Sequence, residues 1–355
     1  MTECSDRYPI VTLHKVLFVV CAFSLMYKYY TTTPNVVISQ PKFTLLGPYN
    51  KTEILVEDTY DKLIDIYNFT FIVNPPVCQD YPAGFLLIVI VSSNPINIEN
   101  RMVIRSTWGE NTDAMKVVFL IGETENRTIA NQLSDEIDQF GDIVQGTFTD
   151  AYRNMTYKHV MGLKWVSHHC PKAKYVLKTD DDVLVYSREL RHFVVRELSP
   201  WGASDLMACQ VIKKAAVQRS NTSKWMVSKE DYPGQFYPTY CSGWAILYSP
   251  DVVIRLLKAA ETTPYFWIDD VHITGTLAMK IGVNHTSLST FVLSEVKEKM
   301  LKVIGSSNIT PFMFGPPDLT TDKIVKLWGV TQDIPVLYHP AYHSNIDTTQ
   351  TEKVP

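Results

Sequence analysis

The sequence predicts an α/β fold in which helices flank a mainly parallel central sheet. Apolar runs at 84–91, 116–121 and 175–177 have the pattern of strands covered on both faces, and the first two are rich in β-branched residues. Helical patterns lie between and after these runs, and strands that alternate with helices favour a parallel sheet. Ligands of such sheets bind beyond the carboxyl ends of the strands. The third run leads directly into three aspartates, so acids are expected at such an end.

Three segments carry the helical pattern. Apolar side chains recur at i, i+3, i+4 and i+8 within 157–165 and again within 190–198, which predicts one buried face for each helix. Ser249 followed by Pro250 is typical of a helix start, with serine as the N-cap and proline at the first helical position.

The composition is that of a globular protein. The 355 residues are 46% hydrophobic and 20% charged, which allows a sizeable core in one large domain or two ordinary ones. The formal net charge of −4 argues against a nucleic-acid partner, which would favour a basic face.

An uncharged, mostly apolar segment at 16–27 lies between Lys15 and Lys28. It is shorter than the roughly 20 residues that span a bilayer, but lysine side chains snorkel and the apolar stretch resumes before His14. A cleaved signal peptide and a short core helix are the alternatives, and the bulky residues after Met26 disfavour cleavage. We therefore expect a retained signal anchor at 16–27 that follows a cytosolic tail at 1–15.

Glycosylation acceptors and cysteines indicate the side of the membrane on which the rest of the chain lies. Four cysteines follow the apolar segment; their even number allows three pairings, and none has metal-site spacing, so two structural disulfides are expected. Both features favour the secretory lumen. The Asn-x-Ser/Thr acceptors, all after the apolar segment, are Asn50, Asn68, Asn126, Asn154, Asn221, Asn284 and Asn308.

The body of the chain divides by composition. Residues 28–80 are rich in Thr, Pro, Asn and Tyr without a sustained period, which predicts a lumenal stem. We expect the main domain at 81–310 and a C-terminal extension of it at 311–355.

Three consecutive carboxylates, Asp180, Asp181 and Asp182, form the strongest local signal. They repel one another, so folding alone gives little reason to place them at a strand end. A hard divalent cation would relieve this repulsion, taking oxygen ligands from carboxylates and from a diphosphate. The alternative is a solvated acidic turn, but apolar residues on both sides favour a buried strand end. The spacing excludes an EF-hand.

A second acidic pair, Asp269 and Asp270, follows an aromatic run. An acid at a helix start is ordinarily a cap that interacts with the helix dipole. The functional alternative is a general base that removes the proton from an acceptor hydroxyl.

Arg101, Arg105 and Trp108 form a spaced set after the first strand. Arginine pairs bidentately with phosphate, and tryptophan can stack on a base or a sugar. On spacing alone, a surface helix with one buried tryptophan is the simpler interpretation.

Five segments together resemble glycosyltransferase family 31, the β-1,3-galactosyl- and β-1,3-N-acetylglucosaminyltransferases. They occur in the family's order and cover roughly residues 78–282. The segments are 101–109 (similar to Arg-x-x-Ile-Arg-x-Thr-Trp), 150–158 (Asp-x-Tyr-x-Asn-Leu-Thr-x-Lys), 170–183 (Cys-Pro…Asp-Asp-Asp-Val), 237–243 (Tyr-Pro-x-Tyr-Cys-Ser-Gly) and 268–275 (Glu-Asp-Val-x-x-Gly).

The resemblance implies a GT-A type nucleotide-sugar transferase fold in a Golgi type II membrane protein, whose domain at 81–310 would be catalytic. It also implies UDP-galactose or UDP-N-acetylglucosamine as donor, Mn²⁺ as cofactor, and inversion to a β-1,3 product. Carried over by position, Asp180 and Asp182 would bind the metal and diphosphate, with Asp181 beside the donor. Asp270 would be the base with Asp269 beside it. The residues implied to approach the donor are Arg101, Arg105, Trp108 and Lys158.

The sequence departs from the family's pattern at three places. Asp269 stands where the family has a glutamate, and Trp244-Ala245 replaces a small, Gly-rich stretch. The family's late histidine aligns with 312–316, which offers no ligand side chain.

Two further expectations concern covalent structure. We expect the disulfides Cys78–Cys170 and Cys209–Cys241, because each pair is separated by elements that would flank one sheet. Asn154 lies inside a family motif at a helix start, so its acceptor sequence is expected to be structural and only partly glycosylated.

The leading functional hypothesis is a β-1,3-hexosyltransferase that acts on glycan acceptors of glycoproteins or glycolipids. A catalytically silent relative, acting as a folding helper or lumenal binding protein, would be expected to lose one of the two acid groups, and both are present. A lectin-like protein would have no use for acids that bind a metal and a diphosphate.

Overall fold

The structure is a computed structural model that describes residues 43–48, 58–79, 81, 83–294 and 312–333. All of them belong to one compact unit, Lys42–Pro355. The predicted tail and anchor, at 1–15 and 16–27, lie outside the described residues. Within those residues, no helix is long and apolar enough to cross a membrane.

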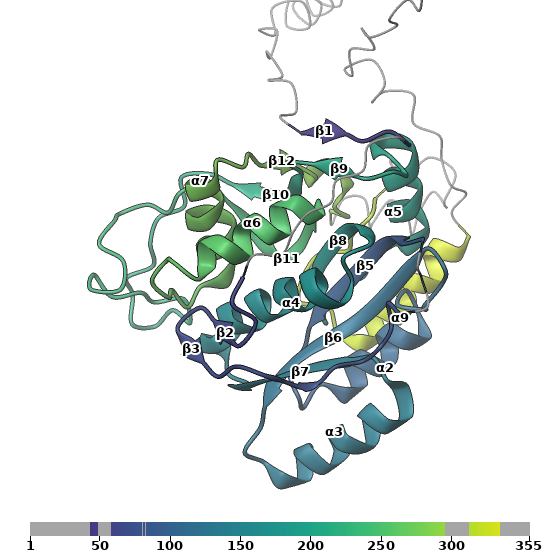
Figure 1. Cartoon of the computed structure of the whole chain (residues 1–355), viewed down its shortest axis with the longest axis horizontal. Coiled ribbons are helices and arrows are strands. Elements are labelled where there is room, and N and C mark those ends of the chain that lie inside the picture. Colours follow the sequence, from purple (N-terminus) through teal and green to yellow (C-terminus); the bar gives the residue numbers. More distant parts are fainter. Residues whose placement is uncertain (1–42, 49–57, 80, 82, 295–311, 334–355) are drawn as a thin grey trace, which may run out of the picture. The chain divides into compact units, whose positions relative to one another are not determined.

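An eight-stranded sheet forms the centre of the described part (Figure 1). The inner strands β8, β5, β6 and β7 are parallel, and the strands beside them, β11 and β4, pair antiparallel, so the prediction of a parallel centre is confirmed. In spatial order the strands are β12 (Thr286–Ser287), β10 (Met207–Ile212), β11 (Tyr240–Tyr248), β8 (Ala173–Asp180), β5 (Phe85–Ser92), β6 (Met115–Glu123), β7 (Ile143–Thr149) and β4 (Phe71–Val73).

Helices cover both faces of this sheet because successive strand residues point to opposite sides. Leu87, Val89 and Val91 of β5 pack in the cluster that includes side chains of α2, α5 and α9. Ile88 and Ile90 pack in the other cluster, with α4 and α6. The helices are α2 (Ile98–Ser106), α3 (Arg127–Phe140), α4 (Met155–His169), α5 (Ser187–Phe193), α6 (Pro250–Ala260), α7 (Ala278–Ile281) and α9 (Thr321–Gln332).

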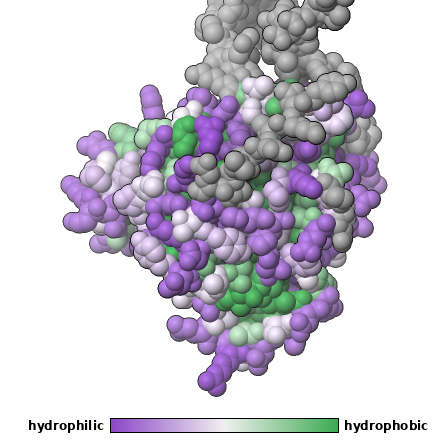
Figure 2. Space-filling view, in the orientation of Figure 1, coloured by the Kyte–Doolittle hydropathy of each residue, from purple (hydrophilic) through white to green (hydrophobic). Residues whose placement is uncertain are grey.

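Shorter elements complete the described chain. Two single turns of 3-10 helix are η1 (Tyr152–Asn154) and η4 (Ser289–Phe291), and two stretches of π-helix are η2 (Val194–Leu198) and η3 (Val271–Leu277). Two small pairs of strands are β1 (Thr44–Leu45) with β9 (Ala203–Ser204), and β2 (Lys62–Leu63) with β3 (Ile66–Tyr67). The face drawn in Figure 2 is mostly hydrophilic, with one apolar area in the lower part of the view.

The three predicted helices are confirmed as α4, α5 with η2, and α6. Ser249 is the N-cap of α6 and Pro250 its first residue, but the Ser249 hydroxyl makes no capping hydrogen bond. Instead it accepts from the backbone N–H of Leu206 at 3.0 Å. The serine therefore ties the helix start to the loop before β10.

Residues 58–79, which the sequence assigns to a stem, pack as part of the folded domain. Strand β4 pairs with β7 at the edge of the main sheet. Leu63 and Phe69 are buried in the same core as α4. The carboxylate of Asp58 pairs with the buried Lys164 of α4. The packed domain therefore begins well before residue 81.

Both expected disulfides are confirmed. Cys78 is joined to Cys170, which ties the segment before β5 to the end of α4. Cys209 of β10 is joined to Cys241 of β11.

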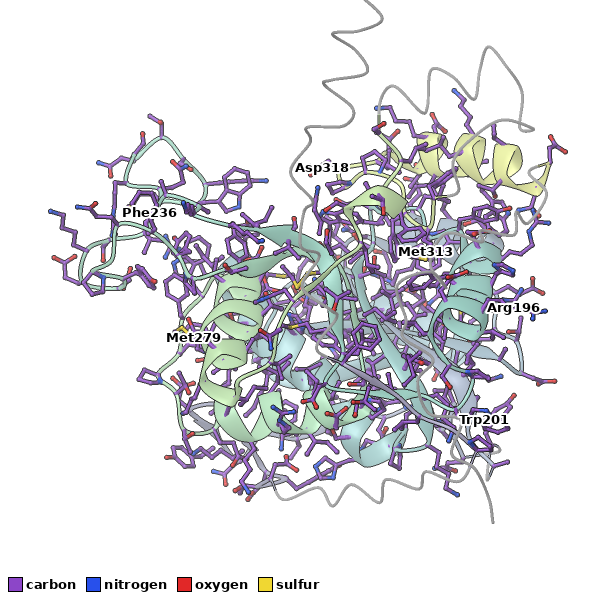
Figure 3. The ribbon with its side chains drawn as sticks, turned by 90° about the horizontal axis from the view of Figure 1, so that it is seen from above. Arg196, Trp201, Phe236, Met279, Met313 and Asp318 are labelled. Carbon is purple, nitrogen blue, oxygen red and sulfur yellow. A yellow bond between two sulfur atoms is a disulfide. The ribbon has the colours of Figure 1, made fainter. Side chains whose placement is uncertain are left out.

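The described part of the C-terminal extension lies beside the aspartate triplet. The N–H of Gly315 donates to the carbonyl of Leu184 at 2.8 Å, and that of Leu319 donates to the carbonyl of Asp182 at 3.0 Å. Figure 3 labels Met313 and Asp318 on this segment. The segment therefore supports the loop in which the triplet ends.

Candidate active site

The aspartate triplet follows β8 at the carboxyl ends of the parallel strands, as predicted, with Asp180 in register with Ser92 of β5. Its three carboxylates have different surroundings. Asp181 is buried, and its carboxylate accepts from the Ser93 hydroxyl at 2.6 Å and from the Asn97 amide at 3.0 Å. Asp181 therefore joins the ends of β5 and β8 to α2.

Asp180 and Asp182 are the less enclosed members of the triplet. Burial and the neighbouring carboxylates raise the pKa of Asp182 to about 6. Asp318 is one of those neighbours. Burial also raises the pKa of Asp180, against the opposing effect of Lys178. The site therefore holds more negative charge than its own cations neutralise.

Lys178 brings the two acid groups together. Its side chain is buried, and Nζ donates to Asp180 Oδ1 at 2.6 Å and to the Gly243 carbonyl at 2.8 Å. Asp269 Oδ2 lies 3.9 Å from the same nitrogen. Burial by itself would lower the pKa of Lys178, but the two carboxylates hold it above its ordinary value, so the ammonium is charged. A lysine two residues before Asp180 faces the same side of the strand, which is the signal that sequence reasoning missed.

Asp269 is held in its ionised form. Burial alone would raise its pKa, but Lys178 and a hydrogen bond from His159 keep the pKa well below its usual value. His159 is fully buried, with Nδ1 3.0 Å from Asp269 Oδ2 and Nε2 3.3 Å from the Tyr248 hydroxyl. Burial lowers the pKa of His159, so the ring is neutral; it donates from Nδ1 and accepts from Tyr248 at Nε2. His159 could not be predicted as part of the site, because nothing local in the sequence links it to Asp269.

Asp270 has the opposite electrostatic environment. Burial and the negative charge of Asp269 raise the pKa of Asp270 to about 7. Its carboxylate accepts from the N–H of Val271 at 2.7 Å, so Asp270 is also the cap that the alternative interpretation predicted. A side chain at Gly243 would place its Cβ 3.1 Å from the Asp270 Cβ, so glycine permits this close approach. A carboxylate with a pKa near neutrality is suited to accept a proton.

The structure does not place Arg101 and Arg105 where a donor could reach them. Arg101 is fully buried; Nη2 lies 2.6 Å from Glu136 Oε2, and Nη1 donates to the Ser93 hydroxyl at 2.9 Å. Arg105 donates to both oxygens of Asp142 at 2.8 Å. Buried guanidinium groups need such partners, and these two obtain them within the fold. Their predicted role at the donor is therefore replaced by a structural one.

The donor-binding role predicted for Trp108 and Lys158 is replaced by a structural role in the same way. Trp108 is buried in the core on the α2 side of the sheet. Lys158 is also buried; its Nζ donates to Asp150 Oδ1 at 2.9 Å and to the carbonyl of Ser93. Lys158 therefore joins the ends of β5 and β7 through its contacts with Ser93 and Asp150.

Trp244 and Phe314, which lie at two of the places where the sequence departs from the family's pattern, contact each other. The rings of Trp244 and Phe314 lie 6.0 Å apart in an edge-to-face arrangement. Trp244 Nε1 donates to the Gln210 side chain at 3.2 Å. The bulky residue on β11 is thus packed against the segment that stands in place of the family's histidine.

The side chains of the triplet offer carboxylate oxygens as metal ligands. Among the described residues, no group of three or more His, Cys, Asp or Glu side chains could hold a metal ion by itself. Asp180 and Asp182 supply hard oxygen ligands, which suit a divalent cation that keeps waters or phosphate oxygens in its shell.

A cavity of about 820 Å³ lies elsewhere, between the amino ends of the parallel strands, where Gly84, Lys172 and Trp201 line it. None of the acidic groups discussed above borders it. We place the candidate site at the acids, because charge, burial and hydrogen bonding converge there.

Comparison with known proteins agrees with this geometry. A galactosyltransferase family model matches residues 99–289, which include both acid groups. The chain is 30% identical to β-1,3-galactosyltransferase 2 of Mus musculus over 275 residues, which are 75% of this chain and 63% of that protein. It is 31% identical to β-1,3-galactosyltransferase 5 of Mus musculus over 60% of this chain and 68% of that one.

A third relative is named for a different activity. The acetylgalactosaminyl-O-glycosyl-glycoprotein β-1,3-N-acetylglucosaminyltransferase of Mus musculus is 34% identical over 56% of this chain and 52% of its own length. The matched region thus spans between half and about two thirds of these relatives. On the family match and these identities, the chain belongs to the galactosyltransferase family, glycosyltransferase family 31.

Proposed function

We propose that this protein is an inverting β-1,3-hexosyltransferase of the GT-A type. It would move galactose or N-acetylglucosamine from a UDP-sugar to a hydroxyl of a glycan acceptor on a glycoprotein or glycolipid. The observation that carries the proposal is Lys178, whose ammonium lies against Asp180 on one side and near Asp269 on the other. One site thus combines carboxylates suited to a metal-bound diphosphate with a carboxylate suited to a base.

Asp270 is the base in this proposal. The acceptor oxygen attacks the anomeric carbon as its proton passes to the Asp270 carboxylate, while the bond from that carbon to the diphosphate oxygen breaks. Attack from the face opposite the leaving group inverts the configuration. Asp269 stays ionised beside Lys178 and His159, so its charge keeps the pKa of Asp270 raised and Asp270 becomes the better proton acceptor.

Asp182 and Asp180 would hold a divalent cation, for which we propose Mn²⁺. The like charges that raise the pKa of Asp182 are the charges that a cation would offset. When bound, the cation would neutralise charge on the departing diphosphate.

We also propose that the protein is a single-pass type II protein of the Golgi membrane, with its catalytic domain in the lumen. Support comes from the two disulfides, which form in oxidising compartments. The acceptor asparagines after the apolar segment agree with this location. The proposed anchor at 16–27 lies outside the described residues.

The direct test uses the full-length chain, because a fragment starting at residue 81 would lack β4 and Asp58. Transfer from UDP-galactose and UDP-N-acetylglucosamine to a panel of simple glycosides would be measured with and without Mn²⁺. We expect metal-dependent transfer from one donor, and a loss of about a hundredfold or more in Asp182→Asn and Asp270→Asn. Asp205→Asn, which removes a surface carboxylate paired with Arg255, is the control.

A folded, disulfide-bonded chain that neither binds UDP nor uses either donor would refute the proposal. The silent relative, a folding helper or glycan-binding protein, would then be the better interpretation.

A further inference from the structure

An ordered excursion of the chain, residues 213–239, lies between β10 and β11. It projects from the rest of the domain and carries Phe236 (Figure 3). Arg219 organises it: the guanidinium donates to the carbonyls of Val227, Ser228, Tyr232 and Gly234 at 2.6–2.9 Å. The Cys209–Cys241 disulfide closes its base. The excursion is therefore a built element with a defined position.

The excursion packs directly on the segment that carries the second acidic pair. Val217, Val227 and Tyr237 form a small apolar cluster with Phe266 and Trp267. Trp267 is two residues before Asp269 in the chain. The position of the excursion is thus coupled to the position of the proposed base.

Two half-exposed aromatic rings lie where the excursion meets this segment. Tyr152 is 52% exposed, and its ring centroid is 6.1 Å from that of Trp267. Trp225 of the excursion is 48% exposed, and its side chain lies close enough to the Tyr152 hydroxyl to lower the pKa of that group. Arg153 lies over the Trp267 ring at 4.6 Å, which fixes the ring beneath Tyr152. About half of the surface of the Tyr152 and Trp225 side chains is therefore open to solvent.

Tyr152 is also close to the acids. Burial raises the pKa of Tyr152, and the charges of Asp269, Asp270 and Asp180 raise it further. The hydroxyl therefore stays protonated and can donate a hydrogen bond to a ligand. An exposed aromatic pair beside ionised carboxylates has an apolar surface for one part of a ligand and polar groups for another.

We propose that Tyr152 and Trp225 form the binding surface for the acceptor saccharide. A pyranose ring packs its C–H face against the two aromatic rings and directs a hydroxyl toward Asp270. The inference rests on the proposed transferase function and adds the residues that select and orient the acceptor. The ligand class is a neutral pyranoside, because the recognition is by aromatic surface and hydroxyl hydrogen bonds.

The test compares Trp225→Ala and Tyr152→Ala with Trp201→Ala in the full-length chain. Trp201 is a matched control because it is 50% exposed and lies on a different part of the molecule from the excursion (Figure 3). With the acceptor varied at saturating donor, we expect the acceptor KM to rise about tenfold or more in the first two variants. The donor KM should move far less, and the ratio of donor hydrolysis to transfer should rise.

A second measurement separates this inference from the proposed function. Saturation-transfer NMR would record the binding of methyl glycosides of galactose, N-acetylglucosamine and N-acetylgalactosamine to the same proteins. If the chain has no transferase activity but binds a glycoside in a way that depends on Trp225, the proposed transferase function is refuted and the saccharide-binding surface is supported. An active enzyme whose acceptor KM is unchanged in both variants would overturn the surface. A chain that neither binds nor glycosylates any of them would overturn both.

Discussion

Replacing Asp269 with asparagine should shift the pH dependence of the reaction. The base, Asp270, must be ionised, so activity falls as the pH drops through its pKa of about 7. Part of that elevation comes from the negative charge of Asp269 on the adjacent residue. Asp269→Asn removes this charge and keeps the shape of the side chain, so Asp270 loses its proton more readily and the acid limb of the profile moves to lower pH.

The size of the shift follows from the charge that is removed. At an effective dielectric constant of about 20, two unit charges about 4 Å apart repel by about 4 kcal/mol, or about three pKa units, and the repulsion weakens as the distance between them grows. Solvent relaxation reduces this, so we expect a shift of about one to two pH units. Lys178 lowers the pKa of Asp270 in the wild type and continues to do so in the variant.

The assay is kcat/KM for transfer, measured between about pH 5 and 9 and normalised to its plateau, so that a lower absolute rate does not obscure the limb. Asp205→Asn should keep the wild-type profile. An acid limb in Asp269→Asn that moves by less than about 0.3 unit, or moves upward, would show that Asp269 does not set the pKa of the base.

Three other outcomes follow from the structure. Arg101→Met should lower the free energy of unfolding by about 3–5 kcal/mol, because it removes a buried partner of Glu136, while the donor KM of the folded protein stays the same. Urea unfolding measures the first effect and donor titration the second. A large rise in donor KM without destabilisation would restore the donor-binding role of Arg101. Replacing Cys209 and Cys241 with alanine opens a crosslink of sequence separation 32, which should cost about 3–4 kcal/mol of stability; an unchanged urea midpoint would contradict this. Asn154 should be only partly glycosylated in peptide mapping, because its amide nitrogen donates to the Thr149 carbonyl at 2.8 Å, and a fully occupied site would refute this.

The strands and helices could be predicted because their patterns are local. The apolar run at 84–91 is covered on both faces, and it forms β5 at the centre of the sheet. The stem boundary could not be found in this way. Residues 58–79 have no sustained period, yet Leu63 and Phe69 are buried against α4, because short irregular segments gain their stability from contacts with distant elements.

The two acid groups could also be predicted, because several carboxylates in sequence are costly to place without a partner. The arginines could not be assigned, because the guanidinium that suits phosphate also suits a buried carboxylate. Glu136, which pairs with Arg101, is 35 residues away in the chain. Local sequence gives no sign of that distant partner.

By itself, the sequence determined the parallel centre of the fold, the presence of the two acid groups, and the place of the first group at the end of a strand. These depend on periodicity, composition and short motifs, which are properties of neighbouring residues. Only the tertiary structure decided that Lys178 joins Asp180 to Asp269, that His159 holds Asp269, and that Tyr152 packs against Trp267. These contacts join residues of different elements, and their charges and hydrogen bonds exist only after the sheet and its helices have packed.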